Sequence, residues 1–210
     1  MTFAREAWPF VLPFVALAGA LYLFRQPAWG TAVLLLGIGT LLFFRDPRRT
    51  FDGPPEIVLA AADGVVTGVD VVEDPAVAAG QLRRVITFLS AFDVHVQRVP
   101  VDGSVVFAGL TPGRKVAAFR ADAGEVNENF LTVIRRVDGD RIGVRQIAGL
   151  MARRVVCYLE QDQTVRRGEH LGLIKFGSRV DLLMPMSYQV LVEKGDRMRN
   201  GETAVARPRS

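Results

Sequence analysis

The sequence predicts a mainly β fold, an antiparallel barrel or sandwich with hammerhead-like units, preceded by an N-terminal α-helical membrane hairpin. Two long uncharged apolar stretches lie within the first 49 of the 210 residues. Beyond them the apolar stretches become short, rich in valine and separated by glycine turns. These observations divide the chain into a membrane-anchoring hairpin at residues 1–49 and a β-rich domain at residues 50–210.

The two apolar stretches have nearly membrane length. Residues 7–24 and 26–44 carry no charged side chain over 18 and 19 residues. A helix of 18 residues is about 27 Å long, close to the hydrocarbon core of about 30 Å. Pro9 and Pro13 interrupt the first stretch, and a second stretch follows at once, which argues against a cleaved signal peptide. The prediction is a retained hairpin that either spans the bilayer or lies shallowly in it.

Basic residues flank this hairpin unevenly. Arg5 precedes it, Arg45, Arg48 and Arg49 follow it, and Arg25 lies at its turn. Because basic residues favour the cytoplasmic side of a membrane, we predict a cell inner membrane protein with its β domain on the cytoplasmic side. The three arginines after the hairpin are expected to meet anionic lipid headgroups.

Short apolar stretches bounded by turn residues predict strands along residues 50–210, and Asp-Gly pairs mark three of the turns. The predicted strands are Ile57–Ala62, Val65–Val72, Val85–Leu89, Val94–Val99, Ser104–Ala108, Leu131–Val137, Arg141–Ile147, Val155–Leu159, Leu171–Phe176, Val180–Met184 and Tyr188–Val192. Short helices are predicted at Phe119–Asn129 and Ala148–Arg154. This pattern favours a curled antiparallel sheet.

One strand–turn–strand pattern occurs twice, at Val165–Ile174 and Val192–Glu202. It resembles the hammerhead units of lipoyl and biotinyl carriers. Those carriers need a modified lysine at a hairpin tip between the units, where this chain reads Phe176-Gly177-Ser178-Arg179. The scaffold is therefore similar while the chemistry differs.

Composition removes several classes of site. The single cysteine, Cys157, excludes an internal disulfide framework and a multi-cysteine zinc site, and it is expected to be buried and inert. Two histidines argue against a histidine-rich metal centre, so no metal is predicted. A net charge of +4 suits a membrane surface as well as nucleic acid. The hairpin favours the membrane, and no nucleic-acid partner is predicted.

Three polar residues are candidates for chemistry. Ser178 follows a glycine between two apolar stretches, His95 lies on a strand with alternating polar residues, and Asp63 follows an apolar strand. Each also has an ordinary structural interpretation, as a turn serine, a core histidine and an Asp-Gly turn.

Together with the hairpin, these residues resemble the short form of the bacterial phosphatidylserine decarboxylases. The resemblance covers about residues 45–200. The matching motifs are Ala62-Asp63-Gly64, Phe92-Asp93-Val94-His95-Val96-Gln97-Arg98, Pro100-Val101-Asp102-Gly103, Asn127-Glu128-Asn129, residues 146–154, Gly168-Glu169 and Phe176-Gly177-Ser178-Arg179-Val180-Asp181.

The resemblance implies a pyruvoyl enzyme that processes itself. Members of this family cut their own chain between Gly and Ser, here Gly177 and Ser178. The products are a β chain of residues 1–177 and an α chain of residues 178–210, which form a heterodimer. Whether two heterodimers pair is left open. The Ser178 hydroxyl would attack the Gly177 carbonyl, and the resulting pyruvoyl group would serve as the electron sink in place of pyridoxal phosphate.

The implied activity converts phosphatidylserine to phosphatidylethanolamine and CO2 through a Schiff base between the substrate amine and the pyruvoyl group. His95 is expected to protonate the substrate α-carbon, because histidine ordinarily titrates near neutrality. Asp63 is expected to help activate Ser178 or to orient the histidine. Longer relatives carry a second histidine where this chain has Arg98, so the base that activates Ser178 is either His95 or Asp63 with a water.

Arg114 and Lys115 either contact the substrate phosphate or form a solvated loop. Two other functions stay open. One is a membrane-anchored hammerhead adaptor without catalysis, which predicts an intact chain. The other is a pyruvoyl decarboxylase of a different serine lipid.

Overall fold

The computed structural model describes residues 1–114, 116, 123–149, 155–175 and 178–209. The chain forms two compact units, residues 1–48 and residues 49–210. The prediction of a mostly antiparallel β fold after an N-terminal helix pair is confirmed.

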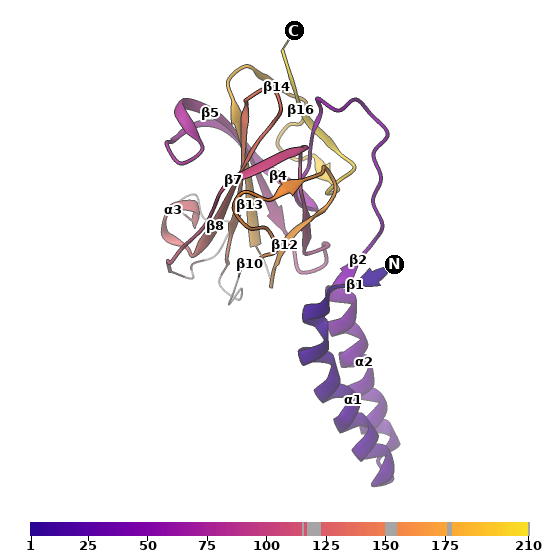
Figure 1. Ribbon diagram of the computed structural model, residues 1–210. Helices are drawn as coiled ribbons and strands as arrows, with labels where there is room; N and C mark the ends of the chain where they lie inside the picture. The colour runs from indigo at the N-terminus through magenta and orange to yellow at the C-terminus, as the bar shows by residue number, and fades with distance from the viewer. Residues whose placement is uncertain (115, 117–122, 150–154, 176–177, 210) are drawn as a thin grey trace. The chain divides into compact units, whose positions relative to one another are not determined.

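The first unit is a helical hairpin. Helices α1 (Trp8–Leu23) and α2 (Pro27–Phe43) pack side by side (Figure 1). Arg25, between them, has a φ of 57°, which the tight turn requires. Strand β1 (Thr2–Phe3) pairs antiparallel with β2 (Arg45–Asp46) and closes the open end of the hairpin, next to a 3-10 turn at Arg5–Ala7.

The hairpin exposes large apolar side chains over most of its surface. The exposed residues of the two helices include Trp8, Phe10, Leu12, Val15, Leu17, Leu23, Trp29, Leu34, Leu35, Leu36, Ile38 and Leu42. Helices that are apolar on nearly every side are typical of a membrane environment rather than of a soluble surface. In the part of the chain that the structure describes, one helix, Arg5–Leu23, is long and apolar enough to cross a membrane, and Pro27–Phe43 is slightly shorter.

The second unit is built from antiparallel strands. Within the described residues, its largest sheet has eight strands in the order β11-β7-β8-β9-β13-β5-β4-β15. These are β4 (Gly64–Asp74), β5 (Ala78–Leu89), β7 (Gly103–Thr111), β8 (Asn129–Arg135), β9 (Arg141–Ile147), β11 (Thr164–Val165), β13 (Ser178–Pro185) and β15 (Arg197–Met198). Two smaller sheets have the orders β10-β12-β6, with bounds Val155–Cys157, His170–Ile174 and Val96–Arg98, and β14-β16-β3, with bounds Tyr188–Val190, Ala204–Pro208 and Val58–Leu59.

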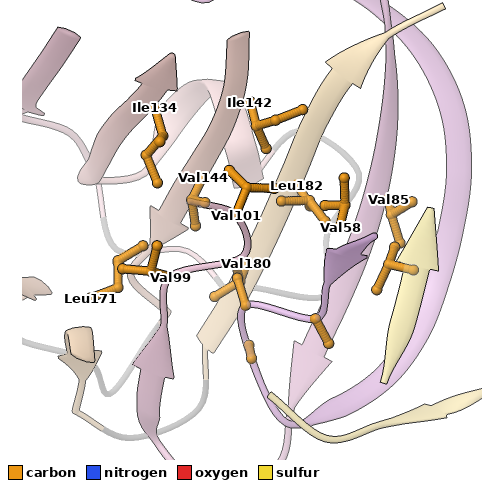
Figure 2. Close-up of a cluster of buried hydrophobic side chains, with 14 of the residues drawn as sticks. Val58, Val85, Val99, Val101, Ile134, Ile142, Val144, Leu171, Val180 and Leu182 are labelled. Carbon is orange, nitrogen blue, oxygen red and sulfur yellow. The ribbon is translucent and has the colours of Figure 1, made fainter. Parts of the chain in front are cut away.

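The hydrophobic core lies against the inner face of the large sheet (Figure 2). Val180 and Leu182 of β13 point into it together with Val144 of β9 and Val85 of β5. The opposite face of β13 is covered as well, because Leu183 packs in a second buried cluster. Burying such a side chain contributes about 1.5–3 kcal/mol. Strand β13 is therefore a central strand that is buried on both faces.

The helix predictions beyond residue 50 are confirmed in part, and residues 119–122 of the first lie outside the described residues. Of Phe119–Asn129, the described residues form only the short helix α3 (Ala123–Val126). The reason is that the Asn127 side chain bonds the backbone of residues 116 and 148 and that β8 begins at residue 129. Of Ala148–Arg154, the first two residues are not helical, and residues 150–154 lie outside the described residues.

Candidate active site

Ser178 is the first residue of the central strand β13 and is completely buried, with 0% of its surface exposed. It pairs with Leu89 of β5, and the next residue, Arg179, pairs with Ile147 of β9. Because side chains alternate along a strand, Ser178 faces the same side as Val180, toward the core. Its buried Oγ makes no hydrogen bond with any residue that the structure describes. An unsatisfied buried hydroxyl costs about 1–3 kcal/mol, which suggests a chemical role.

The strand that precedes the predicted cleavage bond is paired independently. In β12, Leu173 pairs with Val96 of β6. Residues 90–95 run from the end of β5, where Leu89 pairs with Ser178, to Val96. The two ends of this loop are thus held beside the two strands that flank the predicted cleavage bond. This arrangement places the loop and its histidine at the same end of the domain as Ser178.

Hydrogen bonds within the loop fix the histidine. The backbone N–H and Oγ of Ser90 donate to Asp93 Oδ2 over 2.8 and 2.6 Å, and Arg197 donates to Asp93 Oδ1 over 3.3 Å. His95, only 2% exposed, has its Nδ1 3.0 Å from the Asp93 carbonyl oxygen. Since a carbonyl oxygen only accepts, Nδ1 carries the proton, and in the neutral ring Nε2 is the basic nitrogen. Gln97 donates to the His95 carbonyl over 2.8 Å and holds the backbone there.

Asp63 is buried and accepts three hydrogen bonds. Its Oδ1 accepts from the backbone N–H and from Nδ2 of Asn200, both at 2.8 Å, and its Oδ2 accepts from Nη2 of Arg49 at 2.9 Å. Asn200 Nδ2 also donates to the carbonyl of Val96 over 3.0 Å. Asn200 therefore joins Asp63 to the backbone immediately after His95. Burial raises the pKa of Asp63, while the Asn200 bond and the Arg49 charge oppose that rise.

Arg49 corrects one expectation. It was expected to face lipid headgroups together with Arg48, but its side chain is only 9% exposed. Its guanidinium instead bridges Asp63 and Glu202, with Nη1 3.0 Å from the Glu202 carboxylate. Arg48 is exposed. A charged arginine is buried here because two carboxylates compensate it.

Of the other residues that the sequence pointed to, the structure describes Arg98 and Arg114. Arg98 donates to the Gly168 carbonyl over 2.8 Å, so it supports a neighbouring turn. The backbone of Arg114 bonds to that of residue 126, and its side chain is exposed. Gly177 and Lys115 lie outside the described residues.

A buried ion pair directly follows Ser178 on the other face of β13. Arg179 donates from Nε and Nη2 to the two oxygens of Asp181, at 2.6 and 2.7 Å. Arg84 adds a longer contact of 3.7 Å to Asp181. Burial raises the pKa of Asp181, and Arg179 and Arg84 counteract this. The pair fixes the side chain next to the predicted cleavage bond.

Cys157 is partly buried, whereas its apolar strand predicted a buried thiol. Burial nevertheless raises the pKa of its thiol, which lies 3.6 Å from Thr132 Oγ1 and 3.7 Å from the Leu159 carbonyl. Among the described residues, no group of three or more His, Cys, Asp or Glu is placed to hold a metal ion.

Sequence motifs singled out Ser178, His95 and Asp63 as candidates but gave no reason to consider Arg49 and Asn200, which the structure places next to Asp63. Asn200 lies 137 residues from Asp63 in the chain, and Arg49 lies 14 residues before it. An Asn-Gly pair indicates a turn, and an arginine after a membrane helix indicates a lipid contact. No sequence signal connects either of them with the aspartate.

A family model and several curated relatives of this chain carry the same family name. The family described as phosphatidylserine decarboxylase matches residues 37–206 of this chain. A phosphatidylserine decarboxylase proenzyme of Symbiobacterium thermophilum is 41% identical over 204 residues, which cover 97% of this chain and 94% of that protein. Proteins of the same name from Saccharopolyspora erythraea and Granulibacter bethesdensis are 44% and 42% identical, over 92% and 95% of this chain and 85% and 83% of their own lengths.

Proposed function

The chain belongs to the phosphatidylserine decarboxylase family, and on this premise we propose that it converts phosphatidylserine to phosphatidylethanolamine and CO2 with a pyruvoyl group made from its own Ser178. It is a carboxy-lyase, and its relatives are named as proenzymes, which fits a chain that becomes active by self-cleavage.

The state of Ser178 carries this proposal. Its buried Oγ forms no structural hydrogen bond with the described residues, and the strand that begins with it is paired on both sides. A free hydroxyl on a fixed backbone suits attack on the preceding carbonyl carbon, that of Gly177. The acyl group moves from nitrogen to oxygen, and β-elimination of the ester releases a carboxylate at Gly177. Water then replaces the nitrogen of residue 178, which leaves as ammonia.

When formed, the pyruvoyl group supplies the electron sink that loss of CO2 requires. Nε2 of His95 first takes up a proton from water and then transfers it to the substrate α-carbon, since Nδ1 is engaged by the backbone. Burial of this ring keeps bulk water away from the reacting carbon. Asp63 supports the histidine segment through Asn200. The exposed Arg114 contacts the substrate phosphate, together with Lys115, so Arg114→Ala raises KM without changing chain cleavage.

The hairpin brings the catalytic unit to its lipid substrate. Its two helices of 16 and 17 residues are about 24 and 26 Å long, and their apolar residues occupy most faces. A helix that lies flat on a membrane has one polar face, so the hairpin inserts across the bilayer. Basic residues near its base favour the cytoplasmic side of the inner membrane.

Intact-mass spectrometry of the purified full-length protein tests the proposal. We expect fragments of 177 and 33 residues, with a ketone at the start of the shorter one. Ser178→Ala stays intact and inactive, and the exposed-serine control Ser187→Ala behaves as the unchanged protein. An unsplit chain that still decarboxylates phosphatidylserine contradicts the proposal. A split chain that acts only on another serine lipid contradicts its substrate.

A further inference from the structure

We propose that Arg49 and Asn200 are positioning residues that hold the Asp63 carboxylate beside the His95 segment in the geometry that self-cleavage requires. This inference rests on the proposed function and adds two residues to it. Both side chains are buried and bond the Asp63 carboxylate, so each acts through Asp63.

Arg49 has a buried position that a linker residue does not need. Its side chain is 9% exposed and bridges the carboxylates of Asp63 and Glu202 at 2.9 and 3.0 Å. Its Nε is also buried and has no hydrogen-bond partner among the described residues. Burying an arginine with an unsatisfied nitrogen is unfavourable. A surface salt bridge would stabilise the fold without that burial, so the geometry favours a specific role next to Asp63.

Asn200 connects two parts of the site. It is 1% exposed, and it donates to Asp63 twice and to the Val96 carbonyl once. It lies in the segment that follows the predicted cleavage bond, whereas Asp63 and Val96 precede that bond. Asn200 therefore keeps the aspartate aligned with the histidine segment before and after the chain is cut.

The turn at residue 201 fits closely between two arginines. Gly201 has a φ of 68°, and a Cβ there would lie 3.1 Å from Arg98 Cδ and 3.4 Å from Arg49 Cβ. Its N–H donates to the Ala60 carbonyl over 2.9 Å. The turn is thus fixed against the strand that leads to Asp63, and Asn200 has little freedom to move.

Four groups act on the charge of Asp63. Arg49 and the Asn200 hydrogen bond favour the ionised carboxylate, while Asp93 and Glu202 disfavour it, and burial raises its pKa overall. Loss of Arg49 therefore raises the pKa of Asp63 further. If cleavage needs the ionised form, its rate declines as pH is lowered and Asp63 takes up a proton. In the variant this decline begins at a higher pH than in the unchanged protein. Loss of the Glu202 charge acts in the opposite direction.

The test is the pH profile of self-cleavage in full-length chains made by cell-free translation with detergent, followed as the appearance of the 33-residue fragment. Arg49→Ala is expected to move the acid limb upward by about one pH unit, which means about tenfold slower cleavage on that limb. Arg49→Lys restores most of the lost rate. Glu202→Gln leaves the limb in place or moves it downward. Asn200→Ala moves it upward by less than Arg49→Ala, because the backbone N–H remains.

Two results overturn the inference. One is an Arg49→Ala profile that coincides with that of the unchanged chain. The other is an equal slowing at every pH by Arg49→Ala and Glu202→Gln, which indicates a purely structural cluster. If Arg49→Ala does not fold, the Asn200→Ala profile decides, and an acid limb that stays in place there overturns the inference. If even the unchanged chain is never cut, the proposed function itself fails.

Discussion

Removing Arg179 tests how the strand behind the cleavage bond is held. Arg179 is 3% exposed and binds both oxygens of Asp181, which is 1% exposed. Arg179→Met leaves a buried carboxylate with the more distant Arg84, at 3.7 Å, and the weaker influence of Arg145 among the described residues. Removing one partner of a buried pair costs about 3–5 kcal/mol. That is a large part of the roughly 5–15 kcal/mol by which domains are stable.

The pH dependence of this loss follows from the direction in which the pKa of Asp181 moves on folding. Burial already raises this pKa in the folded state, so the folded protein keeps a proton that the unfolded chain has released. Stability therefore falls as pH rises through the interval between the unfolded and the folded pKa. Without Arg179 the folded pKa rises further and the interval widens. The deficit of the variant in free energy of unfolding is thus small near pH 4 and grows toward pH 8. It grows by about 1.4 kcal/mol for every tenfold weakening of the acidity of Asp181 in the folded protein.

Urea unfolding of full-length protein in detergent measures this difference. The Arg179→Met variant and the reference protein both carry Ser178→Ala, so that a single uncut chain unfolds. The control is Arg199→Met, whose side chain is 73% exposed and 3.9 Å from Glu202, and which is expected to change stability by less than about 1 kcal/mol at every pH. A deficit below about 1 kcal/mol for Arg179→Met at pH 8, or a deficit that shrinks as pH rises, would refute the reasoning.

Three shorter predictions concern other parts of the chain. A Cβ at Gly172 would lie 2.1 Å from the Val156 carbonyl oxygen, so Gly172→Ala should lower the free energy of unfolding by about 1–3 kcal/mol in the same urea assay; an unchanged midpoint contradicts the close approach. The raised pKa of Cys157 predicts alkylation by iodoacetamide at pH 8 at least about tenfold slower in folded than in urea-unfolded protein, and equal rates contradict it. Trp8 is the first residue of α1 and Trp29 lies in the first turn of α2, so single-tryptophan variants in vesicles should report opposite interfaces by depth-dependent quenching. Equal depth on one side indicates a hairpin lying flat.

Local patterns predicted the architecture where the pattern itself carries the structure. Arg141–Ile147 was predicted with the bounds of β9, because alternating apolar residues between turn signals define a strand. Strands such as β11 and β15 have two residues each and are too short for any periodicity. They exist because the chain beside them, at β7 and β4, offers free backbone groups. Such pairing depends on tertiary placement that a single sequence does not contain.

In the candidate site, too, local sequence indicates some residues and gives no sign of others. Ser178, His95 and Asp63 stand out by residue type and by neighbouring motif. Their support comes from Arg49 and Asn200, whose importance depends on contacts between distant segments. Arg49 shows the limit of local interpretation, because a charge after a membrane helix suggests lipid contact until two buried carboxylates are found around it.

The strand pairing explains how a chain could be cut between residues 177 and 178 without falling apart. Residues 178–210 contribute β13, which lies between β5 and β9, and β15 and β16, which pair with β4 and β3. Every one of those partners precedes the predicted cleavage bond. On the other side of the bond, β12 is held by β6 and β10. Cleavage at this bond would therefore remove a covalent connection between two strands that are already fixed separately, and it would leave the new first residue in a buried position with its backbone held. A reactive group formed there would keep its orientation without any rearrangement of the fold.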